Sequence, residues 1–399
     1  MRRRAAAVII GGGVIGSSIA FNLTRLGMQD VLLLEREWLG SQASCQSGAL
    51  VRTHYTNAPE ACLAQAGLHW FEHWADLIGG SCGFVQTGFL QICGADDAAR
   101  LHENLRMLQG LGINTELVDQ AALAVLQPGL LLAEQEVAAY EPRSGYADPL
   151  LTMQSLAAAA RRGGAELCEQ VMVHSLRVKD SHILGVETSA GPVDAPLVIL
   201  ANGGWAAELT QALGIDLPMR PVLSQIAIFQ RPGEFPAGPA GHLTLIDRAQ
   251  GYYARPDGDE YSLVGLSGLS RDLQHYDEGV KTYDFALPGQ ARQRIASRMA
   301  SFARARFVRK RSGPLDVTPD RGAIIGGTSL EGLYVAVGMS GSGFKKAPAI
   351  GACLAELIVQ GQASTAPIAP FRLTRFAEQD LIKGNDYLPL SDQSGVTPH

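Results

Sequence analysis

The sequence predicts an α/β protein with a parallel sheet that binds a dinucleotide. The observations that predict it lie together near the N-terminus. An apolar run, Ala5–Ile10, is followed by Gly11-x-Gly13-x-x-Gly16 and then by a helical pattern. A second apolar run, Val31–Leu34, ends at the acidic residue Glu35. Strand, glycine turn, helix and strand in this order are typical of a βαβ unit that binds the pyrophosphate of a dinucleotide.

Each residue of this turn has a physical role. Gly11 permits the turn, Gly13 lets the backbone approach a pyrophosphate, and Gly16 lets the helix pack closely on the strand. The N-terminus of the helix offers free N–H groups and the positive end of its dipole to the phosphates. Glu35 follows Gly16 by 19 residues, where a carboxylate can accept hydrogen bonds from an adenosine ribose. An ordinary glycine-rich turn in another α/β protein is the alternative explanation.

The composition is that of a globular protein with enough apolar residues for a large core. Of the 399 residues, 46% are hydrophobic and 18% are charged, and the length suggests two domains or one large α/β domain. The formal net charge of -6 argues against a nucleic-acid partner, for which a basic face is expected. The six cysteines are scattered without a Cys-x-x-Cys pair, so the sequence predicts neither a metal site nor a disulfide framework.

The first residues resemble a signal peptide, because Arg2, Arg3 and Arg4 precede an apolar run. Glycines interrupt that run, however, and no small-residue cleavage site follows. No other segment has the unbroken apolar length that spans a bilayer. We therefore expect a soluble cytoplasmic protein without an integral membrane segment.

The middle of the chain predicts strands separated by helices. Two short strands are expected within Phe84–Cys93, and a three-stranded meander is expected from residues 165–173, 182–188 and 191–200. From Pro218 to Leu266, strands alternate with Pro/Gly turns, which predicts antiparallel sheet. The last stretch, from Gly384, is expected to be loosely held.

A second glycine-rich unit lies near the C-terminus. Residues 332–338 predict a strand, residues 339–346 (MSGSGFKK) a turn, and residues 347–360 a helix with Pro348 in its first turn. Earlier in the chain, an apolar strand runs into the segment LANGGW, which ends at Trp205. That segment predicts another place where the fold meets its nucleotide.

Taken together, these motifs resemble the D-amino-acid oxidase family of flavoproteins, with sarcosine oxidases, their β-subunit type and proline dehydrogenases as the most similar members. The likeness rests on GGGVIG with Glu35, the loop with Arg52, LANGGW, GPLDVTPDRGAIIG (313–326) and GMSGSGFKKAP (338–348). It extends over nearly the whole chain, and none of the motifs singles out a substrate.

The resemblance implies a discontinuous Rossmann-like FAD-binding domain and an α+β substrate domain whose antiparallel sheet roofs the flavin. In this family FAD lies extended, which places the adenosine at Glu35, the pyrophosphate at the first glycine turn and the isoalloxazine beneath the sheet. The turn at Gly341–Lys345 then meets the flavin with a helix N-terminus, which stabilises the negative charge of a reduced flavin. The expected boundaries are 1–85, 146–217 and 313–399 for the FAD-binding domain, and 86–145 and 218–312 for the substrate-binding domain.

FAD is expected to be non-covalent. Gly313-Pro-Leu-Asp stands where single-chain sarcosine oxidases carry a flavin-linked cysteine. Ala147 or Asp148 stands where the β-subunit type carries its flavin-linked histidine. The residues expected to bind FAD are Gly11, Gly13, Val14, Ile15, Gly16, Glu35, Arg36, Ser44, Gly48, Ala49, Leu50, Val173, Ala201, Asn202, Gly203, Trp205, Gly313, Gly338, Gly341, Ser342, Gly343, Phe344 and Lys345.

Two cations are the candidates for binding a substrate carboxylate. Arg52 and Lys345 match residues with this role in sarcosine oxidases, and Arg provides a planar fork while Lys adds a point charge. For Arg52 the alternative is a structural ion pair. For Lys345 it is a solvated charge, with Lys346 as the functional neighbour.

No general base is evident in the sequence. Flavin amine oxidation requires a neutral amine, and burial under a closed roof favours that form. Tyr55, Tyr252 and Tyr253 are candidates for shaping or hydrogen-bonding the substrate. A role in the core of the roof is the alternative for all three and the stronger expectation for Tyr253. His54 is expected to hydrogen-bond within its loop.

The expected function is that of an FAD-dependent oxidoreductase that oxidises the CH–NH bond of a small amine or amino acid to an imine by hydride transfer to flavin N5. N-methyl amino acids and proline-like secondary amines come before D-amino acids. The alternatives are a flavoprotein subunit of a multi-component amine dehydrogenase, an NAD-dependent dehydrogenase and a non-enzymatic nucleotide-binding scaffold. The second glycine-rich unit argues against NAD, and the pair of cations argues against a scaffold. The electron acceptor and a homo-oligomeric state stay open.

Overall fold

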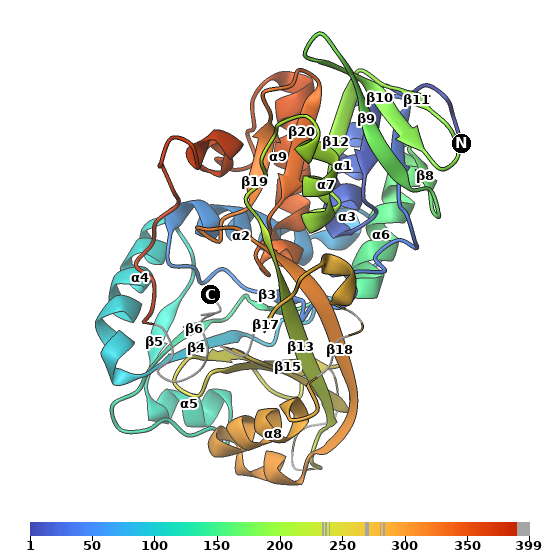
Figure 1. Ribbon diagram of the computed structural model, residues 1–399. Helices are drawn as coiled ribbons and strands as arrows, with labels where there is room; N and C mark the ends of the chain where they lie inside the picture. Colours follow the sequence, from blue (N-terminus) through green and yellow to red (C-terminus); the bar gives the residue numbers. More distant parts are fainter. Residues whose placement is uncertain are drawn as a thin grey trace.

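The computed structural model describes residues 1–388 except 234, 236, 237, 239, 268–270, 280, 282 and 283. It contains two large sheets, and the paired strands β13 (Arg220–Gln230) and β18 (Arg306–Val317) form a long ribbon that reaches from the lower sheet towards the upper part of the molecule (Figure 1). Among the described residues, no helix is both long enough and apolar enough to cross a membrane.

The first large sheet has six strands in the order β19-β20-β12-β1-β2-β8. Every neighbouring pair is parallel except β19 and β20. The predicted parallel sheet is therefore present, with an antiparallel strand at one edge. The strands are β1 Ala7–Ile10, β2 Val31–Leu34, β8 Glu166–Cys168, β12 Leu197–Leu200, β19 Ile324–Gly327 and β20 Leu333–Val337.

This sheet is buried on both faces because different elements cover each side. Ala7 and Ile9 of β1 belong to a core that they share with α1, α2, α6 and α9. Val8 and Ile10 point the other way, into a core shared with α7 and a small sheet of order β11-β10-β9. Successive side chains on a strand point to opposite faces, so an unbroken apolar run suits a strand that is covered on both.

The chain forms helices and several short 3-10 turns. The C-terminal helix begins at Gly343, four residues before its predicted start, so Pro348 lies inside the helix and not in its first turn. The helices are α1 Val14–Arg25, α2 Ala58–Glu72, α3 Trp74–Leu77, α4 Ala98–Gly110, α5 Gln120–Leu126, α6 Pro149–Arg162, α7 Ala206–Gln211, α8 Leu287–Arg298 and α9 Gly343–Gln360. The 3-10 turns are η1 Ala95–Asp97, η2 Gly203–Trp205, η3 Tyr276–Glu278, η4 Ala300–Arg304, η5 Ala369–Phe371 and η6 Leu373–Arg375.

The second large sheet has the order β17-β13-β16-β15-β14-β4-β6-β5, with β18 also paired to β13. It is antiparallel as predicted, apart from the parallel pair β14 and β4. On one face, Ala227, Phe229 and Tyr252 pack with α8. The remaining strands are β4 Phe89–Cys93, β5 Glu116–Val118, β6 Val137–Glu141, β14 Thr244–Asp247, β15 Tyr252–Asp257, β16 Tyr261–Leu266 and β17 Arg271–Asp272.

Two strand predictions are wrong in detail. Phe84–Cys93 holds one strand, β4, because Gly88 adopts a φ of +77° and Val85 makes only an isolated bridge to Tyr146. The meander consists of β9 (Val173–Lys179), β10 (His182–Thr188) and β11 (Val193–Asp194), whereas β8 and β12 join the parallel sheet. In both cases the outcome depends on pairing with strands that are distant in the sequence, which local patterns do not reveal.

The strands of the parallel sheet lie in residues 1–85, 146–217 and 313–399, and most strands of the second large sheet lie in 86–145 and 218–312. β18 passes through position 313, so the two parts of the molecule share this strand. A short pair, β3 (Leu50–Val51) and β7 (Gly145–Tyr146), adds a second connection.

Candidate functional site

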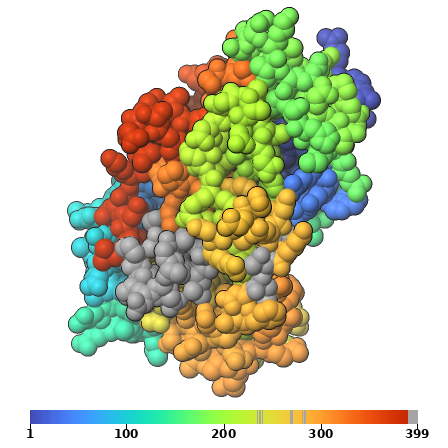
Figure 2. All heavy atoms as spheres, in the orientation of Figure 1, coloured from blue at the N-terminus to red at the C-terminus, as the bar shows by residue number. Residues whose placement is uncertain are grey.

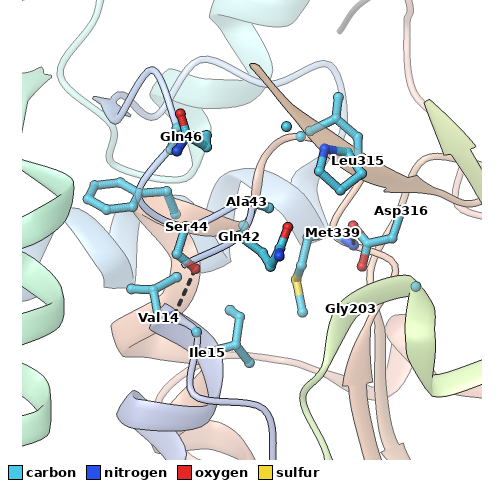
Figure 3. Close-up of a pocket in the computed structure, with 18 of the residues that line it drawn as sticks. Val14, Ile15, Gln42, Ala43, Ser44, Gln46, Gly203, Leu315, Asp316 and Met339 are labelled. Carbon is cyan, nitrogen blue, oxygen red and sulfur yellow. Dashed lines mark hydrogen bonds between the residues drawn. The ribbon is translucent and has the colours of Figure 1, made fainter. Parts of the chain in front are cut away.

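A cavity of about 390 Å³ is lined by residues of both large sheets and their loops. Its walls come from the glycine turn after β1, the loop of residues 40–50, the turn after β20 and strands β13, β14, β15, β16 and β18. Figure 3 shows Val14 and Ile15 from the first turn, Gln42 and Ser44 from the loop, and Asp316 from β18 around one space.

The first glycine turn has the shape that close backbone approach requires. Gly11 has a φ of +108°, and a Cβ added there would lie 2.6 Å from the Ala201 carbonyl oxygen. A Cβ on Gly16 would lie 1.9 Å from the Gly11 carbonyl oxygen, so helix and turn fit only with glycine. The Val14 N–H donates to Ser44 Oγ at 2.9 Å, the dashed line in Figure 3. Ser44 thereby connects the loop to the N-terminus of α1.

Glu35 lies at the end of β2 and lines the cavity. Its Oε2 accepts a hydrogen bond from the Gly12 N–H at 2.7 Å. Beside it, the Arg36 guanidinium lies 4.4 Å from the ring centre of Trp205 and 2.7 Å from Asp277 Oδ1, which also accepts from Trp205 Nε1 at 3.0 Å. In Figure 2 the yellow-orange segment with η3 meets the yellow-green segment with η2 at this end. Asp277 could not be singled out from the sequence, because its partners Arg36 and Trp205 are distant in the chain.

Asp316 is a second carboxylate that sequence analysis missed. It lines the cavity and accepts the backbone N–H groups of Gly338 at 2.7 Å and Met339 at 3.1 Å, so it holds the second glycine-rich turn in place. Burial raises the pKa of Asp316 to about 6 against the opposing effect of these N–H groups. α9 begins after Ser342, whose side chain does not cap the helix, so the first N–H groups of α9 are uncapped at the cavity.

A buried cluster of cations lies where the segment after β3 meets the first turn of α9. Arg52 and Lys345 line the cavity and are only 5% and 6% exposed. Lys345 Nζ donates to the Tyr55 hydroxyl at 3.2 Å, and the Arg52 guanidinium lies 4.6 Å from the Tyr55 ring centre and 5.6 Å from that of Phe89. The Arg52 guanidinium also donates to the carbonyl oxygen of His54. Tyr55 lies next to both cations without lining the cavity itself.

The two neighbouring lysines differ in their partners. Lys346 is fully buried, forms an ion pair with Glu60 and donates to Ser342 Oγ at 2.6 Å. Lys345 has no ion pair with a carboxylate of the described residues and faces the cavity. These contacts favour Lys345 over Lys346 as the cation that meets a ligand.

The electrostatics of this cluster are unusual. Burial lowers the pKa of Lys345 to about 8, and the charges of Arg52 and Lys346 act in the same direction. Burial alone would raise the pKa of Tyr55, but the charges of Lys345, Lys346 and Arg52 outweigh it and lower that pKa. Burial, together with the charge of Arg52, lowers the pKa of His54 to about 3, so His54 is neutral near pH 7.

Most residues expected to bind FAD line the cavity, while Gly16 and Gly338 shape the two turns from behind it. The cavity is also lined by residues that sequence analysis did not single out, among them Gln42, Tyr276 and Arg321. The expected residues that line it are Gly11, Gly13, Val14, Ile15, Glu35, Arg36, Ser44, Gly48, Ala49, Leu50, Val173, Ala201, Asn202, Gly203, Trp205, Gly313, Gly341, Ser342, Gly343, Phe344 and Lys345.

The expectation that Tyr252 faces the site and Tyr253 lies in the core is wrong, because the structure has the reverse arrangement. Tyr252 is fully buried in the core under α8, on the face of β15 away from the cavity. Tyr253, the next residue, lines the cavity. Because neighbouring side chains on a strand point to opposite faces, only one of them can face the site.

The end of the described chain is also better held than expected. Tyr387 is 6% exposed, the Asn385 N–H donates to the Thr56 carbonyl at 2.9 Å, and the Leu388 N–H donates to Asp97 Oδ1 at 2.8 Å. Residues 384–388 therefore pack onto both parts of the molecule, and the rest of that stretch, 389–399, lies outside the described residues.

The cavity fits an extended cofactor with phosphates. The N-termini of α1 and α9 both lie at the cavity, and helix N-termini favour negative charge; Ser44 Oγ accepts the Val14 N–H of α1, whereas the N-cap side chain of α9 caps none of its N–H groups. Asn202 Oδ1 is buried at the cavity and accepts no hydrogen bond from the described residues, which leaves it available to a ligand donor. In the part of the chain that the structure describes, one group could hold a metal, His69, Glu72 and His73, and it lies outside the cavity with Glu72 paired to Arg143.

Comparison with known proteins identifies relatives along the whole fold. A family model described as DAO, FAD dependent oxidoreductase, matches residues 6–357. The chain is 30% identical to 4-methylaminobutanoate oxidase (formaldehyde-forming) of Paenarthrobacter nicotinovorans, over 89% of this chain and 43% of that protein. It is 22% identical to sarcosine oxidase subunit beta of Rhodobacter capsulatus, over 96% of this chain and 91% of the subunit.

Among solved structures, L-proline dehydrogenase from P. horikoshii superposes with a TM-score of 0.88 at 24% identity, over 96% of this chain and 100% of that chain. This likeness confirms the predicted fold. The chain spans less than half the length of the first relative named above. Between the two cofactor classes that the Gly-x-Gly-x-x-Gly turn leaves open, the family match decides for FAD.

Proposed function

Since the chain belongs to the DAO family of FAD-dependent oxidoreductases, we propose that it oxidises the CH–NH bond of a small amine that carries a carboxylate. N-methyl amino acids and proline-like secondary amines are the first candidates, and D-amino acids follow. The observation that carries the proposal is the pair Arg52 and Lys345, which are buried at the cavity without an ion pair to a carboxylate of the described residues. The charge of Arg52 lowers the pKa of the buried Glu141 carboxylate, but burial outweighs this effect and raises that pKa. A ligand carboxylate would therefore supply charge compensation that the two buried cations need.

The chain's own residues would bind and orient such a substrate. The planar guanidinium of Arg52 suits two parallel hydrogen bonds to a carboxylate, and Lys345 adds a point charge beside the Tyr55 hydroxyl. Tyr253 would shape the pocket from β15. Bound FAD supplies the acceptor for the hydride at N5. Its isoalloxazine would lie near the turn before α9, and its phosphates at the first glycine turn.

The substrate amine must be neutral when its C–H bond is broken. An enclosed cavity disfavours the charged ammonium form, which makes deprotonation easier than in water. His54 is not the base in this proposal, because its side chain faces Tyr387 rather than the cavity and its pKa is about 3.

A second candidate function has its own support. The chain covers 91% of a protein named sarcosine oxidase subunit beta, and that name describes one component of a larger assembly. In this alternative the chain binds FAD and substrate but requires partner chains for turnover. Purified alone, it would be reduced by substrate yet pass electrons slowly to an acceptor.

The test is an anaerobic titration of the purified yellow protein with sarcosine, L-proline and a panel of D-amino acids. Bleaching of the flavin band at about 450 nm by one of these compounds is the expected result, because the flavin itself reports the arrival of the hydride. Re-admitting air then separates an oxidase from a dehydrogenase or an incomplete assembly. A yellow protein that no amine bleaches would contradict the proposed substrate class.

A further inference from the structure

Lys345 and Lys346 are adjacent and both buried, and yet their electrostatic surroundings differ. Lys346 has Glu60 as its counter-ion, whereas Lys345 has the Tyr55 hydroxyl and no carboxylate of the described residues. A buried ammonium group without a counter-ion loses its hydration without compensation. Burial without a counter-ion therefore shifts the protonation balance of Lys345 towards the neutral amine as long as the cavity holds no anion.

The two cations near Lys345 lower its pKa, in the same direction as burial. Arg52 comes from the segment after β3, Lys346 from α9 itself, and both are cations that disfavour a third. The opposing group is Tyr55, whose hydroxyl lies 3.2 Å from Lys345 Nζ and whose own surroundings include all three cations and Glu60. The balance of burial and charge leaves the pKa of Lys345 at about 8.

We propose that Lys345 enters the reaction as a neutral amine, accepts the proton of the substrate ammonium, and then holds the substrate carboxylate as a cation. This inference rests on the proposed function, because it requires a zwitterionic amino acid as substrate. It gives Lys345 a catalytic role beyond the binding of a carboxylate.

The step balances without any further reactant. The substrate ammonium N–H bond breaks, a new N–H bond forms at Lys345 Nζ, and the substrate changes from a zwitterion to a neutral amine with a carboxylate. The new positive charge at Lys345 lies beside the negative charge that the substrate brought in. Arg52 cannot perform this step because its guanidinium stays protonated. Proton and counter-ion thus reach Lys345 together, and the amine nitrogen keeps the lone pair that imine formation uses.

The first test measures proton uptake when a carboxylate without an amine binds. Methoxyacetate resembles sarcosine with an ether oxygen in place of the amine, so it cannot donate a proton to Lys345. Calorimetry of the holoenzyme in buffers of different ionisation enthalpy gives the number of protons taken up. With a pKa of about 8, we expect uptake of about 0.9 proton at pH 9 and close to none at pH 6.

Two variants separate this account from simple charge pairing. Lys345→Arg keeps a cation for the carboxylate but is already charged, so its proton uptake at pH 9 should vanish while methoxyacetate still binds. Lys179→Arg makes the same exchange at an exposed position on β9 and should behave as the wild-type protein. Equal proton uptake by Lys345→Arg and the wild-type protein, or no uptake by the wild-type protein at pH 9, would overturn the proposal.

The second test follows the anaerobic reduction of the flavin against pH. For the wild-type protein, the apparent second-order rate constant should rise about tenfold per pH unit below pH 8 and then level off. For Lys345→Arg, the rate constant should keep rising with pH up to the pKa of the free substrate amine, because the substrate must then arrive deprotonated. An unchanged limb in this variant would contradict the inference and leave the proposed function intact. Failure of every amine to reduce the flavin, or of methoxyacetate to bind, would refute the proposed function and with it this inference.

Discussion

The hydroxyl of Tyr387 lies 2.6 Å from Nε2 of His54, and the two rings are stacked with their centres 6.1 Å apart. This contact joins residues 384–388 to the loop that carries Arg52, since the Arg52 guanidinium donates to the His54 carbonyl. Arg248 strengthens the contact, because its guanidinium lies 5.0 Å from the Tyr387 ring centre and donates to the Leu388 carbonyl at 2.7 Å. The end of the described chain is thus connected through His54 to Arg52, the residue proposed to bind a carboxylate.

Tyr387→Phe tests this support. Loss of a buried hydrogen bond should lower the free energy of unfolding by about 1 kcal/mol and should weaken the binding of methoxyacetate, because His54 and Arg52 lose their fixed position. Urea denaturation and a spectroscopic titration of the flavin measure the two effects. Tyr334→Phe removes the same atom from β20 outside the cavity and serves as the control. Unchanged methoxyacetate affinity in Tyr387→Phe would show that the contact does not act on the site.

Acid should destabilise the protein through two buried histidines. Burial lowers the pKa of both His54 and His242 to about 3, from an ordinary value of 6.5. Below pH 6.5 the unfolded chain binds protons that the folded protein does not, so stability falls as the pH falls from 6.5 towards 3. Each histidine contributes a slope of about 1.4 kcal/mol per pH unit in that window.

Urea unfolding at pH 5, 6 and 7 measures this dependence. His242 is held by the Leu243 carbonyl and Ser262 Oγ, each at 2.8 Å, and its variant His242→Gln should lose one of the two proton-linked slopes. His69→Gln replaces an exposed histidine on α2 and should leave the slope unchanged. Equal slopes in the wild-type protein and in His242→Gln would contradict the assignment of a buried, neutral His242.

The predictable part of the fold is local. The turn from Gly11 to Gly16 and the acid Glu35 follow from glycine conformation and from a fixed spacing along a βαβ unit. The order of Tyr252 and Tyr253 across β15 does not follow, because a strand fixes their alternation but not which face meets α8.

Contacts between chain segments that folding brings together also cannot be predicted from the sequence. Asp316 forms hydrogen bonds to backbone groups 22 and 23 residues away, and nothing in its local pattern distinguishes it from other acids. Tyr387 is 333 residues from His54, and its burial follows from packing onto α4 and the Arg52 loop rather than from local propensity. The candidate cations Arg52 and Lys345 were found only through the resemblance to a family, not through spacing.

Gly16→Ala should abolish FAD binding. Its Cβ would lie 1.9 Å from the Gly11 carbonyl oxygen and 3.2 Å from the Gly11 carbonyl carbon. Both are backbone atoms, which cannot move without opening the turn. The flavin content of the purified protein, read from its absorption spectrum, gives the result. Gly110→Ala, at the end of α4 where an added Cβ meets nothing within 4 Å, should retain full flavin content. A Gly16→Ala protein as yellow as the wild-type protein would show that the pyrophosphate lies elsewhere.

Arg52→Gln should weaken carboxylate binding by roughly 30- to 150-fold, the equivalent of about 2 to 3 kcal/mol for a charged hydrogen-bond partner. A titration of the flavin spectrum with methoxyacetate measures the dissociation constant. Arg25→Gln, an exposed arginine at the end of α1, provides the matched control. The account would be contradicted by an Arg52→Gln variant that binds methoxyacetate as tightly as the wild-type protein.

The central claim is that the protein oxidises an amine whose carboxylate is bound by Arg52 and Lys345 at the cavity. The most direct measurement compares the anaerobic reduction of the bound flavin by two matched pairs, sarcosine with dimethylamine and L-proline with pyrrolidine. The account predicts that at least one of the two amino acids bleaches the flavin and that its partner without a carboxylate does so at least 100-fold more slowly, about 2.7 kcal/mol of binding and orientation energy. Equal rates for an amino acid and its decarboxylated partner would contradict the claim.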